Sequence, residues 1–248
     1  MSGHSKWDKI HRQKGVADAK RGSIFTKHSK NVTIAAKNGG DPTMNFSLRL
    51  AIDNAKRDNM PKDNIDKAIK KGTGELEGVN YEDVMYEGYA PGGIPILIEG
   101  VTDNKNRTTP EVKSILSKNG GSLGAQNSVA WMFEHKGVIH IDNEKIGDPS
   151  SLDELRRTSK DELMMELLDS GAEDVVEEDG LTVYTSFESF ESVRKYLEEK
   201  NIETSYCELD WVAKDKVEVD DKKGEKIAKL VESLEEHDDV NSVYTNVA

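Results

Sequence analysis

The sequence predicts an α+β protein of several domains, in which a basic helical bundle precedes two α/β domains and one of these is inserted in the other. Three observations predict this class. The apolar spacing changes from helical to strand-like after residues 74–78, residues 137–212 show the order β-α-β-β-α-β, and the charge is unevenly distributed. The first 73 residues carry 16 Lys and Arg against 7 Asp and Glu, and the other 175 carry 18 against 40.

The composition also favours several small domains. Of the 248 residues, 35% are hydrophobic and 33% are charged, which gives little core for much surface. Cys207 is the only cysteine, so no intramolecular disulfide can form, as is typical of a reducing cytosol. No apolar run approaches the ~18–20 residues that span a bilayer, and the first residues lack a secretory h-region. We therefore expect a soluble cytoplasmic protein without membrane partners.

The first part of the chain is predicted to be an arm followed by three helices. Residues 1–22 are polar and basic, and they indicate a mobile arm or a helix that orders on binding. Helical apolar spacing then covers 23–37, and Asn38-Gly39-Gly40 ends it. A second helix is expected over 46–58. The third has Pro61 at its first helical position and ends at Gly72.

Strand-like spacing dominates the middle of the chain. Strands are expected at 84–89 and 94–101, joined by the turn Tyr89-Ala90-Pro91-Gly92-Gly93. A helix should follow with Thr109 as its N-cap, Pro110 at its first position and a stop at 119–121. Two further strands are predicted at 128–133 and 138–141.

The remaining sequence alternates between helices and strands. A polar loop at 143–158 leads to a capping box at 159–162, whose helix ends at Gly171. Strands at 172–177 and 181–185, a helix capped by Ser186 and a strand at 202–212 complete the split unit. A last helix through Ile227 and Leu234 and a strand at 240–247 return to the middle domain. The predicted domains are 1–76, 77–135 plus 213–248, and 136–212.

Positively charged side chains concentrate in the arm and the first helix. Lys and Arg neutralise phosphates, and the indole of a tryptophan stacks on unpaired bases. The alternative is a solvated tail that only keeps the module soluble. The candidate contacts with nucleic acid are Lys6, Trp7, Lys9, Arg12, Lys14, Lys20, Arg21, Lys27 and Lys30.

The loop at 102–108 is the second candidate contact. Its side chains Asn104, Lys105, Asn106 and Arg107 can offer donors to phosphates or base edges beside a helix N-terminus. The same residue types are equally typical of Asx-turns and N-caps, so both interpretations stay open.

No pattern predicts catalysis or cofactor binding. The glycine-rich loops at 88–93 and 120–124 match neither nucleotide-binding fingerprint and favour a tight hairpin and a helix stop. Cys207 has no nearby His, and the common hydrolase motifs are missing. His4 and His11 lack further ligands at metal spacing. We expect no enzyme, cofactor, metal site or small-molecule substrate.

Seven groups of short motifs follow one another along nearly the whole chain. They are G-H-S-K-W at 3–7, D-A-K-R-G at 18–22 with F-T-K at 25–27, M-P at 60–61, Y-E-G-Y-x-P-G-G at 86–93, D-N-x-N-R-T at 103–108, G-G-x-L-G at 120–124 and G-A-E-D-V at 171–175. In this order they resemble the YebC/PmpR family of probable transcriptional regulators, whose mitochondrial relative is the translational activator of cytochrome c oxidase. The polar stretch 143–160 is the least family-like part.

The resemblance implies an N-terminal helical bundle and two ferredoxin-like α/β domains, the third inserted in the second. It also implies a cytosolic regulator of gene expression without catalytic activity. Only the basic N-terminal motifs and the loop 103–108 carry over, as candidate contacts.

Three functions remain open on the sequence. The first is a transcriptional regulator that binds DNA through residues 1–73. The second is a translation factor that binds ribosomal or transfer RNA, with its acidic domains facing ribosomal proteins. The third is a protein–protein adaptor. No helix presents a clear set of base-reading side chains, so the residues themselves do not predict sequence-specific DNA recognition.

Overall fold

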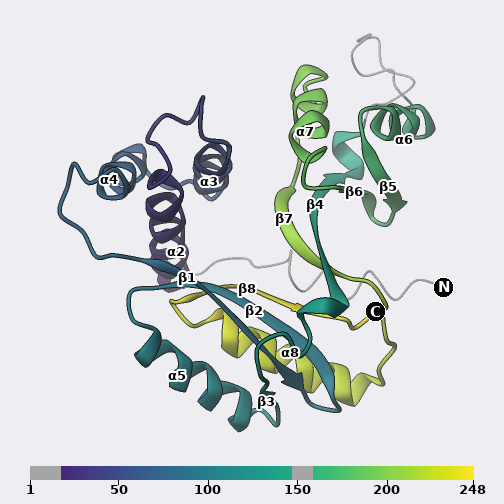
Figure 1. Cartoon of the computed structure of the whole chain (residues 1–248). Coiled ribbons are helices and arrows are strands. Elements are labelled where there is room, and N and C mark those ends of the chain that lie inside the picture. The colour runs from purple at the N-terminus through teal and green to yellow at the C-terminus, as the bar shows by residue number, and fades with distance from the viewer. Residues whose placement is uncertain (1–17, 147–158) are drawn as a thin grey trace. The chain divides into compact units, whose positions relative to one another are not determined.

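The computed structural model describes residues 18–146 and 159–248, which form two compact units (Figure 1). The inserted unit is the described part of Phe133–Lys214, and the larger unit comprises residues 18–132 and Asp215–Ala248. Helices at the start of the chain and two four-stranded antiparallel sheets confirm the predicted α+β class. The division into domains at residues 76, 135 and 212 stays a prediction.

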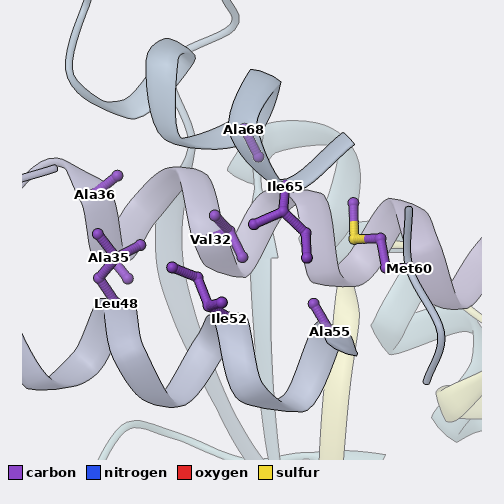
Figure 2. Close-up of a cluster of buried hydrophobic side chains, with 9 residues drawn as sticks. All are labelled: Val32, Ala35, Ala36, Leu48, Ile52, Ala55, Met60, Ile65 and Ala68. Atoms are coloured by element: carbon purple, nitrogen blue, oxygen red, sulfur yellow. The ribbon is translucent and has the colours of Figure 1, made fainter. Parts of the chain in front are cut away.

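Three helices form the bundle of the larger unit: α2 (Asp18–Ala36), α3 (Phe46–Arg57) and α4 (Lys62–Gly72). Each contributes apolar side chains to one buried cluster, shown in Figure 2. The cluster consists of Val32, Ala35, Ala36, Leu48, Ile52, Ala55, Met60, Ile65 and Ala68. Their spacing of three and four residues places them on one side of each helix, which is why the sequence predicted the three helices. The first of them begins at Asp18, five residues before its expected start at residue 23.

Helices α2 and α4 pack closely at one glycine. A Cβ atom on Gly72 would lie 2.3 Å from the carbonyl oxygen of Thr33. The hydroxyl of Thr33 also donates a hydrogen bond of 3.2 Å to the carbonyl oxygen of Ala68. Pro61 has an extended ψ of 138° and is the N-cap of α4, so its predicted place as the first helical residue was wrong by one position.

A sheet of order β3-β1-β2-β8 forms the rest of the larger unit. Its strands are β1 (Glu82–Ala90), β2 (Ile94–Thr102), β3 (Ser122–Leu123) and β8 (Val240–Thr245). β1 and β2 form the predicted hairpin, whose turn places Gly92 and Gly93 at positive φ. Helices α5 (Lys105–Lys118) and α8 (Asp221–Glu235) cover one face of this sheet (Figure 1).

Helix α5 begins earlier than the sequence predicted. Asn104 is its N-cap, and its side-chain oxygen accepts hydrogen bonds from the backbone N–H groups of Asn106 and Arg107. Thr109 and Pro110 therefore lie inside the helix, and their predicted roles as N-cap and first residue were wrong. Pro110 lacks the N–H that would donate to the carbonyl of Asn106, so the helix loses one hydrogen bond near its start and continues.

The predicted strand at 128–133 was also wrong. Residues 124–129 form a loop, and a 3₁₀ turn, η1 (Ala130–Met132), follows. The backbone N–H groups of Asn127, Val129 and Ala130 donate to the side chain of Glu87 instead of a neighbouring strand. The third strand of this sheet is the two-residue β3, which pairs with β1 at Gly88 and Tyr89.

The inserted unit has the ferredoxin-like order predicted for it. Its sheet, β5-β6-β4-β7, contains β4 (Phe133–Asp142), β5 (Ala172–Glu177), β6 (Gly180–Thr185) and β7 (Tyr206–Ala213). Helices α6 (Lys160–Asp169) and α7 (Phe190–Glu199) add buried side chains such as Leu167 and Phe190. The capping box at Ser159 and Glu162 is confirmed. A short 3₁₀ turn, η2 (Asn143–Lys145), follows β4.

Two strand boundaries of the inserted unit differ from the prediction. β4 begins at Phe133, five residues before the expected start at Val138. β7 begins at Tyr206 and not at Ile202, because the N–H of Ile202 donates to Leu197 at the end of α7. Asn201 adopts a φ of 54° at this helix end. Residues 147–158, predicted to be loop, lie outside the described residues.

Candidate nucleic-acid interface

Most of the predicted basic arm cannot be placed. Lys6, Trp7, Lys9, Arg12 and Lys14 lie outside the described residues. Lys20 and Arg21 belong to the first turn of α2, where only the backbone is described. These seven residues stay predictions.

Lys27 and Lys30 have internal partners. Lys27 Nζ donates to the backbone oxygen of Glu235, which is the last residue of α8, at 2.5 Å. Lys30 is 7% exposed, and its Nζ lies 2.5 Å from Oδ1 of Asp239 and 2.8 Å from the backbone oxygen of Asp238. Lys27 therefore joins α2 to the end of α8, and Lys30 joins it to the segment between α8 and β8.

Asp239 lies at the centre of a buried polar network. Besides Lys30, its carboxylate accepts hydrogen bonds from the hydroxyls of Thr108 and Thr102, at 2.7 and 3.1 Å, and from Arg107 Nη2 at 2.7 Å. Burial opposes ionisation of this carboxyl, but the hydrogen bonds from Lys30, Thr108 and Arg107 outweigh it and hold the pKa of Asp239 well below its usual range. One aspartate thus fixes α2, the start of α5 and the start of β8 together.

The side chains of the loop at 103–107 have mixed roles. Asn104 caps α5, so the N-cap interpretation is confirmed for this residue. Arg107 Nη2 lies 2.7 Å from Asp103 as well as from Asp239, and these hydrogen bonds raise the pKa of the guanidinium. Lys105 pairs with Glu82 at 2.9 Å. Lys105, Asn106 and Arg107 are exposed at the N-terminal end of α5, where backbone N–H groups add positive potential.

Exposed cations of the bundle also lie on α3 and α4, and none of these residues is among the predicted contacts. α3 ends in Lys56 and Arg57, and α4 carries four exposed lysines. Among the described residues only one ion pair involves this set, between Lys56 and Asp53 at 3.8 Å. The lysines of α4 are Lys62, Lys67, Lys70 and Lys71. Their spacing on the helix, away from the buried Ile65 and Ala68, is a signal that the sequence contains, but the predicted contacts rest on the density of charge near the N-terminus.

One group of side chains has the residue types of a metal site. The ligand atoms of Glu111, His237 and Asp239 lie within 4.8 Å of one another. Lys30 and Arg107 already occupy the carboxylate of Asp239, and their positive charges would repel a cation. This donor set does not fit a metal ion, and the predicted lack of a metal or cofactor stays a prediction.

No helix in the described part of the chain has the length and apolar character needed to cross a bilayer. The fold and the charged surfaces define a multidomain α+β protein in which a basic helical bundle and an acidic, ferredoxin-like insertion belong to one chain.

Comparison with known proteins identifies the family. Residues 5–75 match the model of the TACO1/YebC protein N-terminal domain, and residues 81–247 match that of the TACO1/YebC second and third domain. The chain therefore belongs to the TACO1/YebC family, as its motifs indicated.

Curated relatives match along the full length. A "Probable transcriptional regulatory protein" of Halothermothrix orenii is 51% identical over 99% of this chain and 94% of its own. One of the same name from Dictyoglomus turgidum is 49% identical over 99% of this chain and 95% of its own. A crystal structure of a conserved hypothetical protein from Aquifex aeolicus aligns with a TM-score of 0.85 and 38% identity, covering 98% of this chain and 97% of that one.

Proposed function

We propose that this protein is a cytoplasmic, non-catalytic regulator of gene expression that binds nucleic acid through its basic helical domain, residues 1–76. The printed names of the relatives support a role in regulation. The observation that carries the proposal is the set of exposed cations on α3 and α4, whose only ion pair within residues 18–146 and 159–248 joins Lys56 to Asp53. Exposed cations of this kind can neutralise phosphates and release counterions.

Our first candidate for the target is DNA, and the mode of contact is to its backbone. The proposed surface combines the arm, the exposed ends of α3 and α4 and the loop residues Lys105 and Asn106. Lys30 is left out, because its ammonium is buried against Asp239 and cannot reach a phosphate without breaking that pair. Arg107 keeps a place at the edge of the surface, since its side chain is 45% exposed while two carboxylates orient it.

A second candidate is a translation factor that binds ribosomal RNA. The inserted unit favours it, since residues 133–214 carry 9 Lys and Arg against 22 Asp and Glu. Such a surface repels phosphates and suits basic proteins, which are abundant on ribosomes. Both candidates use the same basic domain and differ in what the acidic unit contacts.

The test compares two variants of equal charge. The first changes Lys62, Lys67, Lys70 and Lys71 on α4 to Gln, and the matched control changes four exposed lysines of α5 and α8 to Gln. Binding to duplex DNA and to RNA is measured against salt concentration. Each lost phosphate contact should lower the salt slope by about 0.9 on duplex DNA and about 0.7 on single strands. The control residues are Lys113, Lys118, Lys222 and Lys226.

The expected result is a smaller salt slope for the α4 variant and an unchanged slope for the control. Equal losses in both variants would mean that only net charge matters, and the surface would be misplaced. If the protein binds neither DNA nor RNA, both nucleic-acid functions are excluded, and the protein–protein adaptor is the remaining function. Migration with ribosomes in a gradient of cell lysate, lost at high salt, would favour the translation factor over the DNA regulator.

A further inference from the structure

A buried carboxylate organises the loop that follows β3. Glu87 is 5% exposed in β1, and its carboxylate accepts the backbone N–H groups of Asn127, Val129 and Ala130 at 2.5, 2.8 and 2.8 Å. Its backbone oxygen accepts the N–H of Gly124 at 2.7 Å. Burial raises the pKa of Glu87, but the backbone N–H donors outweigh burial and lower it, so the side chain is an anion and the loop is tied to β1 at both ends.

This loop presents an exposed indole. Trp131 is 64% exposed, whereas a tryptophan side chain is usually largely buried. Its Nε1–H, the only polar group of the ring, donates to the backbone oxygen of Ser128 at 3.2 Å. This hydrogen bond fixes the indole to the loop at Ser128, and the carboxylate of Glu87 fixes the loop to β1. The flat faces of the ring are therefore presented in a fixed orientation.

The chain segment that carries Trp131 has no charged side chain of its own. Residues 119–133 contain no Lys, Arg, Asp or Glu, although 33% of the chain is charged. The exposed neighbours Gln126 and Asn127 have amide side chains, which both donate and accept hydrogen bonds. A ligand of this loop would be recognised by stacking and amide contacts and not by its charge.

We propose that Trp131 is a stacking platform for an unpaired nucleic-acid base, oriented by Glu87 and flanked by the amides of Gln126 and Asn127. The proposal rests on the proposed function, because the basic bundle of the same unit supplies the phosphate contacts that bring a strand to the protein. A neutral aromatic surface and a basic one in the same unit match the base and the phosphate of a nucleotide. Stacking on an aromatic ring is tolerant of sequence, so this site adds affinity for single-stranded segments without selecting a base.

The experiment uses the full chain and two oligonucleotides of about 12 nucleotides, a single-stranded RNA and a version with the same backbone and abasic positions. Trp131→Ala should weaken binding of the normal RNA by roughly 5- to 150-fold, which is the range of base–aromatic stacking. It should leave binding of the abasic strand unchanged. Trp131→Phe should restore most of the loss. Phe187→Ala, which removes another exposed aromatic side chain, is the matched control and should bind like the wild type.

A second measurement tests whether the indole ring of Trp131 is exposed to solvent in the free protein. In a protein whose other tryptophans, Trp7 and Trp211, are changed to Phe, acrylamide should quench Trp131 before RNA is added and much less afterwards. A Trp131 that resists quenching in the free protein is covered by other parts of the chain, which overturns the proposal. Equal RNA affinity of Trp131→Ala and the wild type also overturns it, and the ring would then suit an apolar segment of a protein. If the wild type binds neither strand, the stacking proposal fails, and the proposed function fails with it only if duplex DNA is not bound either.

Discussion

The lysines of α2 and those of α4 carry the same charge in helices of one bundle, but their surroundings are opposite. Lys27 and Lys30 of α2 donate to acceptors near the end of α8 and the start of β8. The four lysines of α4 point to solvent. The difference teaches that the positive charge of the bundle has two uses. One set of lysines fixes the bundle to the sheet, and the other remains available to a partner.

The largest expected effect is on the buried pair. Lys30→Met removes the ammonium beside Asp239 and should lower the free energy of unfolding by roughly 3–5 kcal/mol, as is typical when one member of a buried ion pair is lost. Lys70→Met on α4 is the matched control and should change stability by less than about 0.5 kcal/mol. Urea unfolding measures both. Similar values for the two variants would remove the distinction between the helices.

Close packing of the two helices gives the next effect. Gly72→Ala would place a methyl group 2.3 Å from the carbonyl oxygen of Thr33, so α4 must shift away from α2. We expect a loss of about 1–3 kcal/mol, the usual cost of overpacking. Gly22→Ala in α2, where an added Cβ meets nothing within 4 Å, is the control. An unchanged thermal midpoint for Gly72→Ala would show that the two helices separate easily.

Acid should weaken the attachment of α2 to the sheet. The pKa of Asp239 is lowered in the folded protein, so its contribution to stability is complete above the unfolded value of about 3.9 and is lost as the pH falls below it. Asp239→Asn removes this proton uptake and should make stability depend less on pH between about 5 and 2. Unfolding curves at several pH values measure the slope. A slope equal to that of the wild type would contradict the lowered pKa.

The smallest effect should come from Lys27. Its bond to the backbone oxygen of Glu235 is only partly buried, so Lys27→Met should cost about 0.5–1.5 kcal/mol. The salt slope of nucleic-acid binding should not change, because the ammonium is already engaged. A reduced slope with unchanged stability would instead place Lys27 among the contacts of the proposed surface.

Local patterns were enough to predict much of the fold. The apolar spacing of Leu48, Ile52 and Ala55 predicted α3, and the capping box at Ser159 predicted the start of α6. Asn104 and Thr109 are both residue types that occur at N-caps. Pro110 favoured Thr109, because proline is common at the first helical position, but the N-cap is Asn104. Asn104 caps the helix through its own side chain, and Thr108 in the first turn is further held by Asp239, which lies 131 residues away along the chain. Contacts at this separation leave no local pattern.

The candidate site was less predictable than the fold for the same reason. A lysine that binds phosphate and one that is buried in an ion pair look identical in a sequence. Lys30 could be recognised as structural only after β8 placed Asp239 beside it. Glu87 likewise resembled one more surface carboxylate in an acidic chain, and its backbone partners at 127–130 became visible only with the fold.

The position of Asp239 also has a consequence for synthesis. It follows Lys30 by 209 residues, and the whole inserted unit lies between them. While the chain is being made, the ammonium of Lys30 has no carboxylate from β8 and stays hydrated until residue 239 has been added. The bundle therefore acquires its final attachment to the sheet only after residue 239 has been synthesised, when the inserted unit has had time to fold by itself.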